Sequence, residues 1–141
     1  MKWWRRRPGC APDRWLADKM LDEALNVFGT LQAAAYLDDP RLDGDLRERF
    51  RVTALDVLDD VACLASLTGT APPWPSWSRR PMRATPADER PSWTAVRALG
   101  EYTQRLVAVA AVLADREDDT AAAFARLAAS AEVRIEVLAS S

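Results

Sequence analysis

Three aspartates stand close together in the segment DVLDD, at Asp56, Asp59 and Asp60. On a helix these carboxylates occupy adjacent turns, where their oxygens can bind a hard cation such as Mg²⁺. A magnesium-dependent all-α hydrolase is therefore one candidate function. Such a site needs a matching acidic set on a facing helix, and the acids of 18–23 form no recognisable motif. We therefore interpret the cluster as a solvated acidic face and predict no metal site.

The composition argues against other kinds of catalysis. The 141 residues contain no histidine, which removes the commonest general base and the commonest metal ligand. The helical segments carry no pair of nucleophile and base and no glycine-rich phosphate loop. Cys10 and Cys63 lie in a basic and an apolar segment respectively, so we expect two free thiols in a reducing compartment. We predict no catalytic residue, no cofactor and no small-molecule substrate.

Tryptophan, arginine and proline are concentrated in the segment 70–91, which holds six of the nine prolines. Proline keeps this backbone out of regular structure, and tryptophan and arginine are enriched at protein interfaces. We predict that this crossover binds a partner through Trp74, Trp77, Arg79, Arg80 and Arg83. The alternative is that its tryptophans cap the open end of the folded domain.

A second basic and aromatic cluster forms the N-terminal arm, 1–12, whose candidate binding residues are Trp3, Trp4, Arg5, Arg6 and Arg7. Its arginines can meet nucleic-acid phosphates while a tryptophan stacks on a base. The arm can also lie on an anionic membrane surface, or it is a flexible tail with one tryptophan against the body. The net charge is −2 and the pI is about 5.2, so nucleic-acid binding would have to come from such patches.

The elements that position these segments are expected to be four helices, at about 13–38, 45–68, 92–115 and 118–139. Apolar residues recur at three- and four-residue steps in each segment, and no sustained alternation indicates a strand. The residues expected to point inward are Trp15, Leu16, Met20, Leu21, Ala24, Leu25, Phe28, Leu31, Ala35 and Leu37; Leu46, Phe50, Ala54, Val57, Leu58, Val61, Leu64 and Ala65; Trp93, Val96, Leu99, Tyr102, Leu106, Val109, Ala110 and Leu113; and Phe124, Leu127, Ala128, Ala131, Ile135 and Leu138.

Several polar and glycine residues predict details of these helices. Gly69 suits a left-handed C-cap, Ser92 suits an N-cap, and Asp118 or Asp119 should cap the last helix. Arg97, Glu101 and Arg105 alternate in sign at four-residue spacing, which is typical of a solvated face.

The resulting prediction is an all-α four-helix bundle made of two antiparallel α-hairpins joined by the crossover. The bundle comprises 13–141, preceded by the flexible arm. No apolar run approaches the roughly 20 residues of a membrane span, and the basic start is not followed by a signal-peptide core, so we expect a cytoplasmic protein.

For function, the sequence favours an interaction or scaffold protein, a subunit or adaptor that binds a protein partner or a second copy of itself. A nucleic-acid-binding subunit that uses the same tryptophans and arginines is the alternative, and attachment to a membrane surface also stays open.

Overall fold

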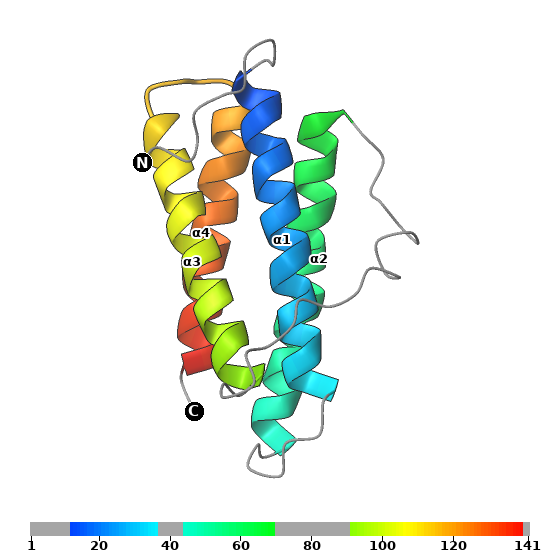
Figure 1. Cartoon of the computed structure of the whole chain (residues 1–141). Coiled ribbons are helices and arrows are strands. Elements are labelled where there is room, and N and C mark those ends of the chain that lie inside the picture. Colours follow the sequence, from blue (N-terminus) through cyan, green and yellow to red (C-terminus); the bar gives the residue numbers. More distant parts are fainter. Residues whose placement is uncertain (1–11, 37–43, 70–90, 140–141) are drawn as a thin grey trace.

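The computed structural model describes residues 12–36, 44–69 and 91–139. These residues form four α-helices and no strand, as the sequence predicts. The helices are α1 (Pro12–Tyr36), α2 (Gly44–Thr68), α3 (Pro91–Val112) and α4 (Asp119–Ala139) (Figure 1). Within these ranges, no helix combines the length and the apolar character needed to cross a membrane.

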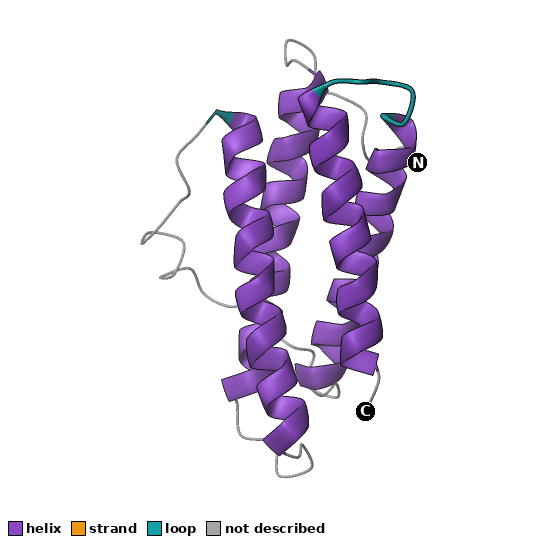
Figure 2. Ribbon diagram, turned by 180° about the vertical axis from the view of Figure 1, so that it is seen from behind, coloured by secondary structure: helices purple, strands orange, loops and turns teal. Residues whose placement is uncertain are grey.

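The four helices lie side by side with their axes roughly aligned, as Figure 1 and the reverse view in Figure 2 show. In Figure 1, α1 and α4 run downward, whereas α2 and α3 run upward. Helix α1 packs against α2 and α3, and α4 packs against α3 and α2. Of these neighbouring pairs, α2 and α4 make the least extensive contact.

The buried face of each helix follows from the spacing of its apolar residues. The largest fully buried side chains include Met20 and Leu31 of α1, Phe50 of α2, Tyr102 of α3 and Phe124 of α4. Partly buried residues then surround this core, namely Trp15, Leu21, Leu46, Leu58, Cys63, Leu67, Ala98, Ala110 and Ile135. Most of the predicted stripe therefore lies in the core, whereas Leu37 lies outside the described residues.

The prediction that Trp93 and Val96 of α3 point into the core is wrong, because both side chains are exposed. The buried face of α3 runs through Ala95, Leu99, Tyr102, Leu106 and Val109 and continues into Leu113, which directly follows the helix. These positions alternate steps of four and three residues, which keeps them on one side of a helix. Trp93 and Val96 do not fall on this series, and the small side chain of Ala95 takes the inward position. The prediction followed three-residue steps back from Leu99 to Val96 and Trp93, and such steps in succession drift around the helix.

Two of the helix caps predicted from the sequence, at Gly69 and Asp118, are confirmed. Gly69 follows α2 with a φ of +73°, the left-handed conformation that glycine adopts without steric cost. The backbone N–H of Ala121 donates to Asp118 Oδ1 at 2.9 Å and caps α4. Helix α3 already begins at Pro91, so Ser92 lies in its first turn and the prediction that Ser92 caps it is wrong.

The prediction that Arg97, Glu101 and Arg105 form a solvated face of α3 is wrong at Arg105. Arg97 and Glu101 are exposed, but Arg105 is partly buried and forms an ion pair with Glu23 of α1. The long arginine side chain reaches the neighbouring helix, so this pair links α1 to α3.

Candidate functional site

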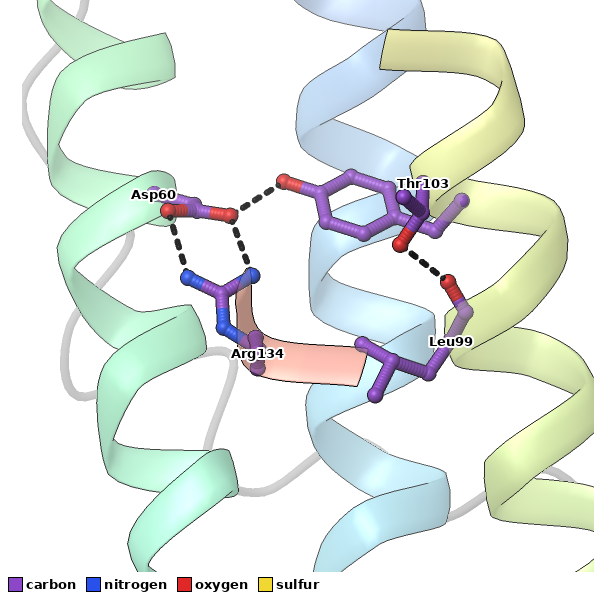
Figure 3. Close-up of polar contacts among 5 residues, drawn as sticks. Asp60, Leu99, Thr103 and Arg134 are labelled. Carbon is purple, nitrogen blue, oxygen red and sulfur yellow. Dashed lines mark hydrogen bonds and ion pairs between the residues drawn. The ribbon is translucent and has the colours of Figure 1, made fainter. Parts of the chain in front are cut away.

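A buried polar network joins three of the helices and begins at Asp60 of α2. Arg134 of α4 donates to this carboxylate through both terminal nitrogens, Nη1 to Oδ2 at 3.0 Å and Nη2 to Oδ1 at 3.1 Å (Figure 3). Tyr102 of α3 donates its hydroxyl to Asp60 Oδ2 at 2.8 Å. Asp60 is 3% exposed and Arg134 is 7% exposed. The network therefore lies in the interior of the bundle.

The prediction that Asp60 belongs to a solvated acidic face is wrong. Asp60 neighbours the buried residues Val57, Val61 and Leu64 on α2, so its side chain falls at the edge of the apolar stripe. A buried carboxylate is tolerated when a partner compensates its charge, and Arg134 supplies that partner. Asp56 and Asp59, in contrast, are exposed as predicted.

Burial and neighbouring charges determine the protonation states of Tyr102 and Arg134. Burial raises the pKa of Tyr102 well above its ordinary value, and the charge of Asp60 raises it further. The phenol therefore stays neutral and donates its hydrogen bond. Burial alone lowers the pKa of Arg134, but the hydrogen bonds and charge of Asp60 outweigh this effect and leave that pKa raised. Arg134 is therefore a permanent cation, and its charge is matched by that of Asp60.

The network is the floor of a surface groove between α2 and α4, with a volume of about 620 Å³. The α2 wall carries Val52, Asp56 and Asp59, while the α4 wall carries Val133 and Val137. Further lining residues are Glu48, Arg49, Thr53, Asp60, Ala129, Ser130 and Arg134. The groove thus has an apolar side on α4 and an acidic side on α2.

The groove exposes apolar area that the fold leaves uncovered. Val52, Val133 and Val137 are 46%, 58% and 56% exposed. Single exposed apolar residues are ordinary in proteins, whereas several that share one concave surface are typical of an interaction site. These valines are therefore the strongest indication of binding in the described part of the chain.

The α2 wall carries three exposed carboxylates, of which one has an ion-pair partner among the described residues. Glu48 is paired with Arg51 on its own helix, through Nε to Oε2 at 2.9 Å. Asp56 and Asp59 form no hydrogen bond or ion pair with another of the described residues. Arg49 also lines the groove, but it lies about two turns from Asp56 and nearly three turns from Asp59 along α2. The groove is therefore most negative around Asp56 and Asp59.

The carboxylates do not form a metal centre among residues 12–36, 44–69 and 91–139, where no group of three or more candidate ligands gathers. Both oxygens of Asp60 accept hydrogen bonds from Arg134, and one also accepts from Tyr102. A cation at the cluster would therefore have to displace a buried, charge-matched partner.

The binding residues predicted from the sequence are not among those that the structure describes. Trp3, Trp4, Arg5, Arg6 and Arg7 of the arm, and Trp74, Trp77, Arg79, Arg80 and Arg83 of the crossover, lie outside the described residues. Sequence reasoning missed Arg134, Val133 and Val137. The available signal was Arg134 itself, which stands three residues after buried Ala131 and four before buried Leu138.

Cys63 is a free thiol at the edge of the core. Burial raises its pKa, an effect that the nearby charge of Arg126 only partly offsets. Cys10 lies outside the described residues.

Comparison with known protein families, with curated proteins and with solved structures found no significant match to this chain. The functional argument therefore rests on the residues of the groove.

Proposed function

We propose that the protein is a non-enzymatic helical interaction protein, a subunit or adaptor of a larger assembly. The observation that carries this proposal is the groove between α2 and α4, in which three valines remain about half exposed beside unpaired carboxylates. In this proposal the bundle consists of two antiparallel hairpins, and the crossover and the arm add contacts through their tryptophans and arginines.

The chemistry of the groove supports binding over catalysis. Its buried groups, Asp60 and Arg134, satisfy each other and are shielded from solvent. Its accessible groups are valines, alanine, serine, carboxylates and the partly exposed Arg49, a mixture suited to apolar contact with a few charged pairs at the edge. Covering the valines would remove apolar surface from water and stabilise a complex.

A rigid floor also favours docking. The two hydrogen bonds from Arg134 fix α2 against α4, the neighbouring pair of helices with the least extensive contact. A surface that is already ordered loses less conformational entropy when a partner binds.

The test is site-specific photocrosslinking in the native host. A photoreactive phenylalanine derivative is placed at Val133 in the groove or, as the control, at Val112, an exposed valine of α3 outside it. We expect covalent adducts with a protein from Val133 and few from Val112. The adducts should still form when nuclease or about 300 mM salt, at which exposed charge pairs are largely screened, is added before irradiation.

Absence of adducts at Val133, or equal adducts at both positions, would contradict the proposal. Failure of the adducts to form after nuclease treatment before irradiation would favour the nucleic-acid alternative. Alanine at Trp74 and Trp77 tests the crossover separately, and we expect it to weaken the captured complex.

A further inference from the structure

The dimensions of the groove are those of a binding site for a helix. On α2 its lining extends from Glu48 to Asp60, a span of about 18 Å at 1.5 Å per residue. Three turns of a partner helix fit along this distance. A small molecule would leave much of the open valine surface in water, whereas a helix can contact both walls along their length.

The α4 wall has the spacing of a helix-packing ridge. Ala129, Val133 and Val137 follow one another at four-residue steps and line the groove together. Such rows form the ridges that fit between the side chains of a second helix. The small side chain of Ala129 allows close approach at one end. The partner must therefore carry an apolar stripe at helical spacing.

The α2 wall selects the charge of that partner. Asp56 and Asp59 are one turn apart and exposed, and neither forms an ion pair with another described residue. The charge of Arg134 acts on Asp56 from the floor of the groove. Arginine or lysine residues one turn apart on the partner can pair with them. A second copy that presented the same groove would bring like charges together, which is unfavourable.

The floor of the groove adds no net charge. Asp60 and Arg134 neutralise each other, so the groove's charge comes from its walls. Arg134 Nε is buried and has no hydrogen-bond partner. This leaves one unused donor beneath the groove.

Taking these features together, we propose that the α2–α4 groove binds a basic amphipathic helix of another protein. The apolar stripe of that helix packs on Val133 and Val137, and its basic residues pair with Asp56 and Asp59. This inference rests on the interaction function proposed above and specifies the partner's chemistry.

The experiment uses the full-length chain and designed helical peptides of about four turns. The first peptide carries leucine at i, i+4, i+7 and i+11 with arginine on both flanks. The second replaces its arginines with glutamate, and the third scrambles the first so that the apolar stripe is lost. Binding is followed by the backbone NMR signals of the ¹⁵N-labelled protein.

We expect the first peptide to shift signals from 48–60 and 129–137, and the other two to bind much more weakly. The double variant Asp56→Asn/Asp59→Asn should weaken the first peptide by about two- to thirtyfold, because each exposed ion pair contributes about 1.4- to 5-fold. The matched control Asp18→Asn/Asp22→Asn removes two exposed carboxylates from α1 and should have a much smaller effect. Val133→Ala should weaken binding more than Val112→Ala, and circular dichroism checks that each variant is folded.

Equal binding of the glutamate peptide, shifts outside the groove, or no effect of the two groove aspartates would overturn the proposal. Signals that change with protein concentration alone would show that a second copy covers the groove, and this would also overturn it. If Val133 crosslinks persist in the host while the basic peptide fails, the partner chemistry is wrong but the interaction function stands. If both fail, the interaction function is wrong as well.

Discussion

The sharpest test of the structure is the replacement of Asp60 by asparagine. This change keeps the size of the side chain but leaves the buried cation of Arg134 without a counter-charge. Breaking one side of a buried ion pair costs about 3–5 kcal/mol in the free energy of unfolding. Since domains are typically stable by about 5–15 kcal/mol, the loss should be obvious in urea denaturation.

A matched control lies one residue away. Asp59 is exposed and forms no pair with another described residue, so Asp59→Asn should change the free energy of unfolding by less than about 0.5 kcal/mol. Tyr102→Phe removes one hydrogen bond to a charged acceptor and should cost about 1.5–3 kcal/mol.

The outcome that refutes this reasoning is equal stability of Asp60→Asn and Asp59→Asn. That result would mean that Asp60 is solvated, as the sequence alone suggested. A double-mutant cycle between Asp60 and Arg134 adds an independent check, since contacting residues in one network show coupling energies of about 0.5–3 kcal/mol.

Three further predictions concern titratable groups. Burial and the charge of Asp60 raise the pKa of Tyr102, so its contribution to stability is fully present below about pH 10, the ordinary tyrosine value, and is lost as pH rises through the folded pKa. In a Tyr36→Phe protein, which keeps Tyr102 as its one tyrosine, phenolate absorbance should appear only as the chain unfolds; a folded protein that ionises near pH 10 would contradict this. Burial also raises the pKa of Cys63, so the alkylation rate of a Cys10→Ser variant should have a midpoint at higher pH than that of a free thiol measured alongside, and an equal midpoint would argue against it. Hydrogen bonds from the Ala121 backbone and from Arg116 lower the pKa of Asp118. Its contribution is therefore present above the ordinary value of 3.8 and lost as pH falls through the folded pKa. Asp118→Ala should lower the melting temperature at neutral pH but not in strong acid, and an equal effect at both would count against the capping role.

The sequence predicted the helices well because their information is local. The spacing of apolar residues, the C-cap at Gly69 and the N-cap at Asp118 each depend on residues close together in the chain. The structure agrees with the prediction in all three cases. The failure at Trp93 and Val96 has the same origin. Both precede Leu99 and Tyr102 at three-residue steps, but repeated steps of three drift around a helix of about 3.6 residues per turn, and Ala95 takes the inward position.

The site was less predictable because it depends on how separate helices meet. Asp60 and Arg134 are 74 residues apart, and they belong to helices that are not consecutive in the chain. Each is a charged residue next to the apolar stripe of its helix, a position that can be recognised in the sequence. To predict that Asp60 and Arg134 pair, one must know the register of α2 against α4, which the spacing of residues within one helix does not determine. The groove walls depend on the same register.

This dependence suggests a role for the network that is separate from stability. Alanine, valine and leucine pack adequately in several registers, whereas a two-bond arginine–carboxylate contact has one geometry. Replacing Asp60, Tyr102 and Arg134 together by leucine, phenylalanine and methionine removes the buried charges and leaves no unpaired hydroxyl. Such replacements are often neutral or stabilising by about 1–4 kcal/mol. We expect this triple variant to remain folded but to bind the basic peptide more weakly than the wild type, because α2 and α4 are no longer fixed in register. Unchanged peptide binding by a stable triple variant would show that apolar packing alone positions Asp56 and Asp59 opposite Val133.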